Sequence, residues 1–454
     1  MSATALEARY RARSLWLDSL PDTLTPRAAL PGDIDCDVAV VGAGFTGLWT
    51  AFYLKSLQPD LRVVVLEREI AGYGPSGRNG GWVSSGVAGS AAAYGLSDGD
   101  NAMRRAREAT EHAVDEVGRV VESAGIDCGY SKQGSIIVAT SEPQRERLGS
   151  YAGRSLIDAE AAAEHINIPG VLAASYSPHG ARVDPARLVR GLADTCEHLG
   201  VTVYEQSEVL EFGKGSVRCA QGTVRADVVL GATESYTTQL PGERMRYLPL
   251  YSLMIATEPL PDEVWAELGW RDGLLVGDMH HLFFYAQRTI DGRIAIGGRG
   301  APYQLSQPIA EHNERSESVR TRLVAALTRH FPAAADAAVT HHWGGPLAVP
   351  RDWSMSIGYN RERGYGRAGG YSGHGVAAAN IAGRTLADLV LGRDTDLVSL
   401  PWVDHHSRRW EPEPLRYLAS RTIIRVLHDA DVREDATGRR SQLTRLAAPF
   451  MPPK

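Results

Sequence analysis

Residues 37–47 read DVAVVGAGFTG, and this stretch decides the fold. The apolar run from Cys36 to Val41 is typical of a buried parallel strand, and Gly42, Gly44 and Gly47 follow it in G-x-G-x-x-G spacing. The next residues, TGLWTAFYLKSLQ, predict a helix. A strand, a glycine turn and a helix in this order predict a site for a dinucleotide diphosphate, because each glycine role excludes a Cβ.

A second strand strengthens this prediction. The run LRVVVL at 61–66 ends at Glu67, whose carboxylate is placed to accept hydrogen bonds from a ribose and to repel a 2′-phosphate. The same glycine spacing recurs in GYGPSG at 72–77 and GYGRAG at 364–369, but neither match is predicted to lie at a strand-to-helix turn. Only the first match therefore predicts a dinucleotide site, with a simple strand-to-helix turn as the alternative.

The composition points to small-molecule chemistry. The chain has 454 residues, enough for two lobes, and its net charge of −6 is mixed along the sequence, which gives no reason to expect nucleic acid or a membrane surface. Its four cysteines are dispersed without metal spacing, so we expect no metal and a reducing compartment. The N-terminus carries acids and arginines, and no run of about 18 apolar residues occurs, so we expect a cytoplasmic protein.

The pattern along the chain predicts an α/β fold in which one lobe is interrupted by the other. The expected elements after the first unit are a glycine-rich loop at 74–86, a helix at 101–123, a hairpin at 129–140, a helix at 183–200, strands at 201–212 and 226–234 that return to the first sheet, antiparallel strands between 248 and 296, a second return at 341–346, and a glycine turn with a helix at 371–392.

Two glycine segments favour a flavin over a nicotinamide. SGRNGGWVSSG follows the second strand, where a flavin ring would continue from the diphosphate, and a flexible surface loop is the alternative. YSGHG at 371–375 directly precedes a helix, whose free N–H groups and dipole would stabilise the negative charge of a reduced flavin. For His374 the alternative is an N-terminal capping residue.

Six motifs follow one another along the chain in this order: GAGFTG, Glu67, GPSGRNGG, VDP at 183–185, ADVVLGATE at 226–234 and GYSGHGVAAANIAGR. Together they resemble the D-amino-acid oxidase and glycine oxidase superfamily over nearly the whole chain. The SGRNGG loop, the GYSGHG turn and a C-terminal extension that begins near LPWVD are most similar to its gamma-glutamylputrescine oxidoreductase-like branch. The resemblance implies a GR2-type Rossmann-like FAD-binding domain, interleaved with a substrate domain built on a mixed, largely antiparallel sheet.

The resemblance also implies domain boundaries and FAD contacts. We expect the FAD-binding domain at 33–115, 176–245 and 340–394, the substrate-binding domain at 116–175 and 246–339, and extensions at 1–32 and 395–454. Glu67 would hold the adenosine ribose, Val209 the adenine through its backbone, and Ala232 would line the diphosphate. Ser76 to Trp82 would pass the flavin ring, and Gly373 to Val376 would face its pyrimidine edge. The full set of implied FAD contacts is Gly42, Gly44, Phe45, Thr46, Gly47, Glu67, Arg68, Ser76, Gly77, Arg78, Asn79, Gly80, Gly81, Trp82, Val209, Ala232, Thr233, Gly373, His374, Gly375 and Val376.

The implied reaction is oxidation of a C–N bond in a small-molecule amine. A hydride passes to flavin N5, the imine hydrolyses to an aldehyde or ketone, and O2 reoxidises the flavin to give H2O2. The alternatives are an amine dehydrogenase or a monooxygenase with another electron partner, and a flavin-binding protein whose redox chemistry is vestigial. The oligomeric state is not predicted.

Two residues that differ from those of related enzymes restrict the class of substrates that we expect. Ala377 stands where sarcosine-oxidase relatives have a lysine for the substrate carboxylate, and Leu347 stands where glycine-oxidase relatives have an arginine. Because an α-carboxylate is costly to desolvate without a fixed cation, we expect plain α-amino acids to be poor substrates. No cysteine follows Cys219 to serve as a covalent flavin attachment point, so we expect non-covalent FAD.

Four side chains are our candidates for the amine cavity: Tyr251, His281, Tyr285 and Trp343. They lie on segments that face the flavin in relatives, and core packing is the alternative. His281 is preferred over His280 because, on a continuous strand, it shares its face with Phe283 and Tyr285. A dry aromatic cavity would favour the neutral amine, and no protein base is required to remove the carbon proton.

Overall fold

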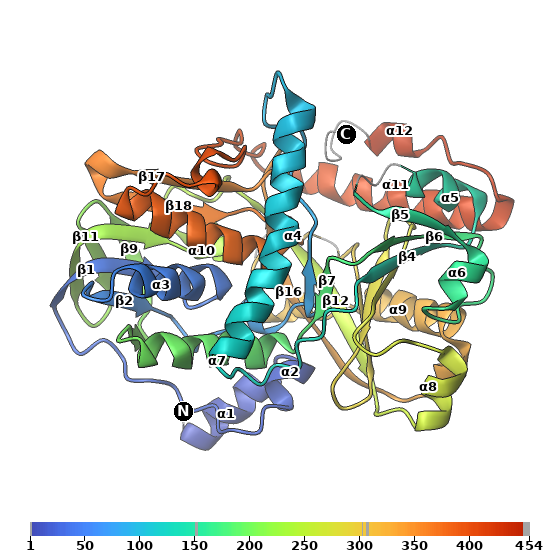
Figure 1. Ribbon diagram of the computed structural model, residues 1–454, viewed down its shortest axis with the longest axis horizontal. Coiled ribbons are helices and arrows are strands. Elements are labelled where there is room, and N and C mark those ends of the chain that lie inside the picture. The colour runs from blue at the N-terminus through green and yellow to red at the C-terminus, as the bar shows by residue number, and fades with distance from the viewer. Residues whose placement is uncertain (1, 150–152, 302, 306–307, 448–454) are drawn as a thin grey trace.

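The computed structural model describes residues 2–149, 153–301, 303–305 and 308–447. The chain forms two lobes, each built on its own eight-stranded sheet, and helix α4 (Gly99–Ser123) stands between them (Figure 1). The predicted helix at 101–123 is therefore confirmed. Its place at the boundary of the lobes gives it access to whatever binds between them.

The first lobe is built around the glycine turn. Strand β1 (Ile34–Val41), helix α3 (Phe45–Leu57) and strand β2 (Val63–Leu66) follow one another as predicted, and every residue of β2 is buried. β1 pairs in parallel with β2 and with β11 (Thr223–Gly231). This confirms the parallel sheet expected from the apolar runs. The carboxyl ends of β1 and β2 meet at the turn, which is where open α/β sheets bind their ligands.

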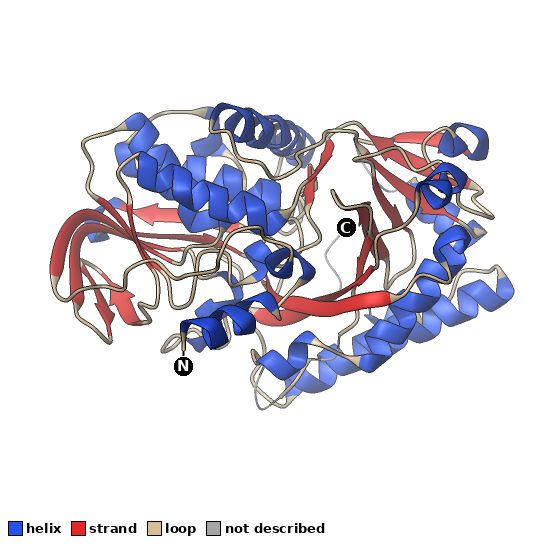
Figure 2. Ribbon diagram, turned by 90° about the horizontal axis from the view of Figure 1, so that it is seen from below, coloured by secondary structure: helices blue, strands red, loops and turns tan. Residues whose placement is uncertain are grey.

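Further elements complete this lobe: β8 Thr202–Tyr204, β9 Val209–Gly213, β10 Ser216–Cys219, β17 Ser356–Asn360, β18 Tyr365–Gly369, α7 Pro185–His198 and α10 Gly375–Leu391. The strand order is β17-β18-β11-β1-β2-β8, with β10 beside β11 and β9 beside β10. In Figure 2 these strands fan out at the left, with helices along one side. Helix α10 packs closely on α3. Gly383 makes this possible, since a Cβ at that position would lie 2.7 Å from the backbone of Trp49.

The second lobe contains β4 Ser135–Ala139, β5 Ser155–Asp158, β6 Ala173–Ser177, β12 Leu248–Thr257, β13 Leu275–Asp278, β14 Phe284–Arg288, β15 Ile294–Gly298 and β16 Val339–Val349. Their order is β16-β12-β15-β14-β13-β4-β6-β5, and only the β13–β4 pair is parallel within the described strands. The mixed, largely antiparallel sheet is therefore confirmed.

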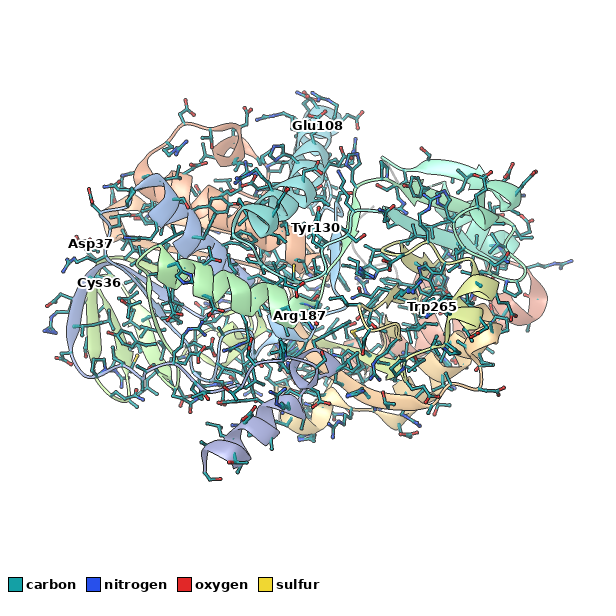
Figure 3. The ribbon with its side chains drawn as sticks, turned by 60° about the horizontal axis from the view of Figure 1, so that its bottom comes forward. Cys36, Asp37, Glu108, Tyr130, Arg187 and Trp265 are labelled. Carbon is teal, nitrogen blue, oxygen red and sulfur yellow. The ribbon has the colours of Figure 1, made fainter. Side chains whose placement is uncertain are left out.

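Helices cover this second sheet. They are α5 Glu142–Leu148, α6 Ala159–Ala163, α8 Asp262–Leu268 and α9 Glu317–His330. Trp265 of α8, labelled in Figure 3, packs edge-on against Trp270, and Trp270 stacks on Phe331 just after α9. This aromatic group belongs to the core of the second lobe.

The return of the chain to the first sheet comes later than expected. Residues 341–346 belong to β16, which pairs with β12 in the second sheet from Val339 to Val349. The predicted return at residue 340 is wrong, because this backbone bonds to β12 and Trp343 is buried against Trp16 in the N-terminal segment. The chain rejoins the first sheet at β17, which is antiparallel to β18.

Two shorter segments also differ from the expectation. Residues 129–140 hold the single strand β4 in place of a hairpin, and Ser131 bridges to Arg182 far along the chain. The loop at 74–86 contains a 3-10 turn, η1 (Pro75–Gly77), and a short strand, β3 (Trp82–Ser84), that pairs with β7 (Gly180–Arg182). The sequence did not predict these elements because the segment is rich in glycine and the pairing partners are distant in sequence.

The N-terminal and C-terminal segments form helices that pack against the two lobes. Helices α1 (Ala3–Arg11) and α2 (Leu15–Asp18) lie at the bottom of Figure 1, and α11 (Leu415–Thr437) and α12 (Thr444–Ala447) lie over the second lobe. The other 3-10 turns are η2 Glu234–Gln239, η3 Glu311–Glu314, η4 Pro332–Ala334, η5 Arg361–Arg363 and η6 Asp396–Ser399. In the described part of the chain, every helix is too short or too polar to span a lipid bilayer.

Candidate functional site

A single cavity of about 900 Å³ runs from the glycine turn of the first lobe to the sheet of the second. Most of the residues predicted to contact FAD line it. They are Gly42, Gly44, Phe45, Thr46, Glu67, Arg68, Ser76, Arg78, Asn79, Gly80, Trp82, Val209, Ala232, Thr233, Gly373, His374, Gly375 and Val376. The fold thus brings segments more than three hundred residues apart in sequence to one continuous space.

The glycines of the turn leave no room for side chains. Gly42 has a φ of +105°, and a Cβ there would lie 2.7 Å from the carbonyl oxygen of Ala232. A Cβ on Gly44 would lie 2.8 Å from Oγ of Ser76, and one on Gly47 would overlap the carbonyl oxygen of Gly42. Gly42 and Gly44 line the cavity whereas Gly47 does not, so the first two keep backbone open to a ligand and the third allows α3 to pack on β1.

Glu67 lies at the end of β2, where it was expected. Its carboxylate accepts N–H groups of Ala43 and Glu69, each at 3.0 Å, and it borders the cavity together with Val209 and Arg68. Burial raises the pKa of this carboxyl, and the hydrogen bonds from the two backbone N–H groups act in the opposite direction. Its predicted role as a ribose acceptor stays a prediction. The position and the remaining acceptor capacity of a carboxylate fit it.

The loop after β2 is held in one shape by its own side chains. Oγ of Ser76 accepts the Phe45 N–H at 2.9 Å, at the first turn of α3, and the Asn79 amide donates to the carbonyl oxygens of Pro75 and Ser76. The Arg78 side chain is fully buried and pairs with Glu314 at 2.8 Å. These bonds fix the loop against the cavity, so it is not the flexible surface loop that was the alternative.

Two glycines of this loop serve packing. Gly77 and Gly81 do not line the cavity, although both were predicted FAD contacts. A Cβ on Gly77 would meet the backbone of Gly72, and one on Gly81 would meet Gln287 and the Val183 carbonyl. Gly80, between them, lines the cavity, and its backbone lies directly against the Tyr285 ring.

Helix α10 begins at the cavity, next to Gly373. His374 occupies its N-cap position, but the imidazole makes no capping hydrogen bond. The first N–H groups of α10 therefore remain available to a ligand at the positive end of the helix. Burial lowers the pKa of His374 to about 4, and the nearby Arg299 guanidinium acts in the same direction, so this imidazole is neutral at pH 7.

Tyr285 is the one catalytic candidate that lines the cavity. It lies on β14, its hydroxyl is 2.8 Å from Oγ of Ser252, and its ring meets the Trp82 ring edge-on at 6.1 Å. Burial raises the pKa of Tyr285 to about 12, so the phenol stays protonated at neutral pH. The structure thus places an aromatic wall and a hydroxyl beside the loop predicted to pass the flavin.

The other three candidates lie outside the lining. Tyr251 is buried in the second-lobe core and exchanges hydrogen bonds with the backbone of Ala310. Trp343 is buried against Trp16, and its indole N–H donates to the Arg78 carbonyl at 3.0 Å. Both therefore pack in the core of the protein and do not line the cavity.

The argument for His281 from strand parity is wrong. Residues 279–283 form a turn between β13 and β14, so His281 does not share a strand face with Tyr285. Carboxylates hold this turn: Asp431 accepts the N–H groups of His281 and Leu282, and Asp278 accepts that of Phe284. The His281 imidazole points to Arg147 and Glu434, away from the cavity lining.

Sequence reasoning missed a cation in the cavity. Arg299, one residue after β15, lines it, and its guanidinium lies 4.7 Å from the Phe283 ring centroid and 5.4 Å from that of Trp353. One guanidinium nitrogen donates to the Ser372 carbonyl at 3.2 Å, beside the start of α10. The premise that the cavity contains no fixed cation is therefore wrong, although Leu347 does line it as an apolar residue.

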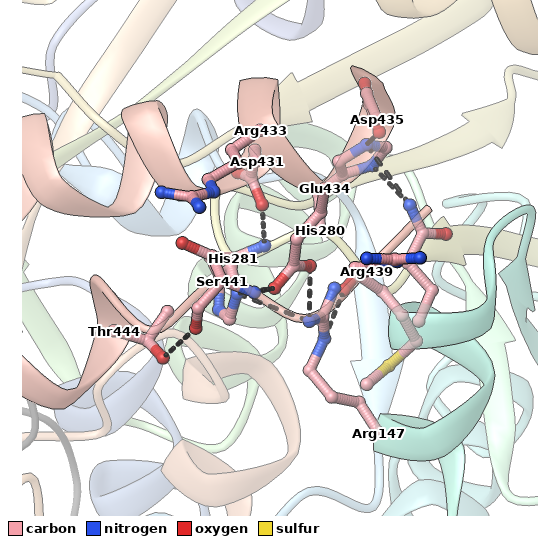
Figure 4. A network of polar contacts seen from close by, with 12 residues as sticks. Arg147, His280, His281, Asp431, Arg433, Glu434, Asp435, Arg439, Ser441 and Thr444 are labelled. Carbon is pink, nitrogen blue, oxygen red and sulfur yellow. Dashed lines mark hydrogen bonds and ion pairs between the residues drawn. The ribbon is translucent and has the colours of Figure 1, made fainter. Parts of the chain in front are cut away.

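The C-terminal helix α11 closes the second lobe through an ionic seam, shown in Figure 4 and defined by Arg147, His280, His281, Asp431, Glu434 and Asp435. Arg147 pairs with the buried Glu434 at 2.7 Å, and His280 lies between the carboxylates of Asp278 and Asp435. Burial alone would lower the pKa of His280, but its hydrogen bonds to the two carboxylates raise it to about 10. His280 is therefore an imidazolium at neutral pH.

Two groups in and beside this seam have the side-chain types of metal ligands. Asp278, His280 and His330 form one group and His281, Asp431 and Glu434 the other, with ligand atoms within 4.8 Å of one another. Most of these atoms pair with each other or with Arg147 and Asp435, and the protonated His280 cannot ligate a metal. We describe the seam as an ion-pair network.

Comparisons with known proteins agree with this architecture. The DAO family, described as FAD dependent oxidoreductase, matches residues 37–389. The chain is 29% identical over 380 residues to gamma-glutamylputrescine oxidoreductase of Escherichia coli, covering 81% of this chain and 86% of that protein. It is 30% identical over 403 residues to the probable oxidoreductase OrdL of Rhizobium meliloti, with 81% and 86% covered.

A solved structure is similar in fold. The glycine oxidase of Geobacillus kaustophilus superposes with a TM-score of 0.67 at 20% identity, covering 82% of this chain and 100% of that one. The family match spans both lobes and the whole of the cavity-lining segments from β1 to α10. The chain therefore belongs to the DAO family of FAD-dependent oxidoreductases.

Proposed function

We propose that this protein oxidises a C–N bond of a small amine, using non-covalently bound FAD. The observation that carries the proposal is the single cavity, which joins the dinucleotide turn and the start of α10 in one lobe to Tyr285 and Arg299 in the other. A space of this kind admits an extended dinucleotide and leaves a side-chain-lined end for a substrate. Bound FAD would supply the hydride acceptor.

The residues present fit FAD. Gly42 and Gly44 leave backbone open where a diphosphate would lie, Glu67 offers a carboxylate at the ribose position, and Gly80 opens the loop that passes the ring. The free N–H groups at the start of α10 would stabilise negative charge at the pyrimidine edge. The neutral state of His374 keeps this end from carrying a second full positive charge beside Arg299.

The substrate end favours a neutral amine. Trp82, Phe283 and Tyr285 give it aromatic walls. An ammonium ion is solvated less completely there than in water, which disfavours the protonated form of the amine. A neutral amine keeps the nitrogen lone pair that drives hydride loss from the α-carbon, and water then hydrolyses the imine. The proposal assigns Tyr285 the role of positioning this amine through its ring and its hydroxyl, which already contacts Ser252.

The names of the relatives support an amine substrate. One sequence relative is a gamma-glutamylputrescine oxidoreductase, and one solved structure of similar fold is a glycine oxidase. Plain α-amino acids remain our less favoured substrates, because the Arg299 guanidinium is already bound to the Ser372 carbonyl and lies between two rings. O2 is the proposed electron acceptor, with H2O2 as product.

Anaerobic flavin reduction tests the proposal. Purified holoenzyme is mixed without oxygen with a panel of primary and secondary amines and with glycine, sarcosine and D-alanine, and the flavin absorbance is followed. We expect amines to bleach the flavin faster than the amino acids do. Admission of air should restore the colour and release H2O2. Slow reoxidation would favour a dehydrogenase, NAD(P)H-dependent bleaching a monooxygenase, and no bleaching by any amine a redox-vestigial protein.

A further inference from the structure

Glu234 places a carboxyl group in the wall of the cavity, and the chemistry described above gives it no role. It directly follows Thr233, whose backbone nitrogen would lie 3.7 Å from a Cβ on Gly42 of the glycine turn. Its carboxylate oxygens accept the N–H groups of Gly370 at 3.3 Å and of Tyr371 at 3.4 Å, just ahead of α10. The residue therefore joins a segment that packs on the glycine turn to the turn that precedes α10.

The backbone around this carboxyl is strained. Glu234 has a φ of +44°, a conformation that residues with a side chain seldom adopt. Ser372, in the turn before α10, has a φ of +51°, and its Oγ donates to the carbonyl oxygen of Trp353, whose φ is +62°. Strain of this kind is characteristic of ligand sites, where the surrounding contacts hold it in place. The strain therefore favours a ligand-binding role for the carboxyl.

No cation accompanies this carboxyl. Within the described part of the chain, no lysine, arginine or histidine forms an ion pair with Glu234. Other enclosed carboxylates of the protein are paired, Glu205 with Arg27 at 3.0 Å and Glu314 with Arg78 at 2.8 Å. An ionised carboxylate without a cation is costly inside a protein, so the neutral acid is favoured. Burial raises the pKa of Glu234 to about 7, and its two backbone N–H partners act in the opposite direction.

The neighbouring charges of the first lobe are already paired. Arg246 and Arg367 both bind the Glu243 carboxylate. Burial alone would raise the pKa of Glu243, but the hydrogen bonds and charges of these two arginines lower it. Tyr247, which faces Glu234 from the segment before β12, is a phenol whose pKa burial raises, so it stays neutral. These groups leave the charge of an ionised Glu234 uncompensated.

The groups on the cavity side do not compensate it either. Tyr371 is a neutral phenol because burial raises its pKa, and His374 is a neutral imidazole. The Arg299 guanidinium lies over aromatic rings and donates to a backbone carbonyl, and it does not contact Glu234. The other acids that line the cavity are Glu67, Glu111, Glu208 and Asp278, which can only add negative charge.

A bound FAD would make ionisation of Glu234 harder still. The side chain is half-buried and lines the cavity, so a ligand that fills the cavity reduces its exposure. The diphosphate also brings two negative charges into the same space. Both effects raise the pKa of a carboxyl. A protonated acid, by contrast, can donate its O–H to a phosphate or ribityl oxygen.

We propose that Glu234 is protonated in the FAD-bound protein and binds the cofactor as a hydrogen-bond donor, so that FAD binding takes up one proton. The proton comes from the solvent and returns to it when FAD leaves. This inference rests on the FAD of the proposed function and adds a residue that was not among the expected FAD contacts. Above the pH at which the cofactor-free protein loses this proton, each pH unit weakens FAD binding by about tenfold.

Infrared spectroscopy of the holoenzyme tests the proton directly. At about pH 8 the unmodified holoenzyme should show the C=O band of a protonated carboxyl, and Glu234→Gln should lose that band. Glutamine imitates the protonated acid, because it keeps an oxygen acceptor and gains an N–H donor. Glu243→Gln is the matched control, since this carboxylate is ionised and lies outside the cavity lining, and it should keep the band. A spectrum that Glu234→Gln leaves unchanged would overturn the proposal.

Dilution of the holoenzyme at several pH values, followed by flavin fluorescence, gives the Kd of FAD. In the unmodified protein the Kd should rise about tenfold per unit between about pH 7.5 and 9. Glu234→Gln should retain FAD and lose this rise. Glu234→Ala, which has no donor, should bind FAD about fivefold more weakly than Glu234→Gln at pH 6. A rise that persists in Glu234→Gln and vanishes in Glu67→Gln would assign the proton to Glu67 and overturn the inference.

These measurements do not depend on amine oxidation. If FAD is bound but no amine bleaches it, the proposed function fails, and the infrared band and the Kd still decide the role of Glu234. A folded protein that binds no FAD at any pH would overturn both proposals.

Discussion

The two walls of the cavity are built by different means. The wall from the first lobe is largely backbone: glycines at the turn, in the loop and at the start of α10 face the ligand. The wall from the second lobe is made of side chains, and α11 holds the turn beside it through the ionic seam. An added Cβ would clash at Gly42, Gly44 and Gly80 of the backbone wall, whereas a side-chain wall tolerates exchange so long as the charges behind it stay paired.

The largest expected effect breaks the backbone wall. In Gly47→Ala the new Cβ would overlap the carbonyl oxygen of Gly42, so the turn and α3 must separate. We expect protein with little or no bound FAD, measured as the ratio of flavin to protein absorbance. Gly213→Ala is the control, because no heavy atom lies within 4 Å of a Cβ there. Unchanged flavin content in a folded Gly47→Ala protein, judged by circular dichroism, would contradict the comparison.

The next effect breaks the ionic seam. Glu434→Gln removes the charge of a buried carboxylate that pairs with the half-buried Arg147 at 2.7 Å, which should lower the free energy of unfolding by about 1.5–3 kcal/mol. Asp429→Asn on the exposed side of the same helix breaks the Arg425 pair and should change stability by less than about 1 kcal/mol. Urea unfolding checks both values. We expect Glu434→Gln to keep its FAD, and equal destabilisation by the two variants would argue against the seam.

The pH dependence of stability sharpens the comparison through two histidines, His374 in the backbone wall and His280 in the ionic seam beside the side-chain wall. His280 in the seam has a pKa raised to about 10, so its contribution to stability is complete below pH 6.5 and is lost as pH rises from 6.5 to 10. The maximum slope is about 1.4 kcal/mol per pH unit. His280→Asn should remove this alkaline loss, measured by urea unfolding across the pH range. An unchanged alkaline slope would mean that Asp278 and Asp435 do not hold the proton.

His374 at the start of α10 should act in the opposite direction. Its pKa is lowered to about 4, so the unfolded chain binds the proton more tightly and stability falls as pH falls from 6.5 to 4. His374→Asn should remove that acid loss. The expected change is smaller than for His280 because the shift from 6.5 is smaller. Acid titrations of the variant and the unmodified protein, followed by unfolding, provide the measurement.

Sequence patterns predicted the backbone wall well because its chemistry is local. Gly42, Gly44 and Glu67 were predicted from their spacing after a strand, and the structure places all three at the cavity. The parity of residues 279–283 failed for a physical reason. Carboxylates of Asp278 and Asp431 accept the N–H groups of this segment, so a strand ladder does not form there, and Asp431 is far away in sequence.

The side-chain wall was harder to predict for the same reason. Arg299 follows two glycines at the end of a strand, and nothing in that local pattern indicates that its guanidinium reaches Ser372. The local sequence also does not show which charges of α4 face the cavity. Arg104–Glu108 and Arg107–Glu111 have the same spacing, and only the fold shows that one pair faces solvent and the other the cavity.

The order of strands in the first sheet has a consequence for biosynthesis. β1 and β2 leave the ribosome early, but β11 follows more than a hundred residues later and β18 and α10 later still. The cavity is not complete until residue 379 has emerged, so a ligand that contacts all of its walls binds a nearly finished polypeptide and not a nascent half. A ligand of the completed cavity therefore stabilises this protein only after most of the chain has been made, when the last long-range strand pairing has formed.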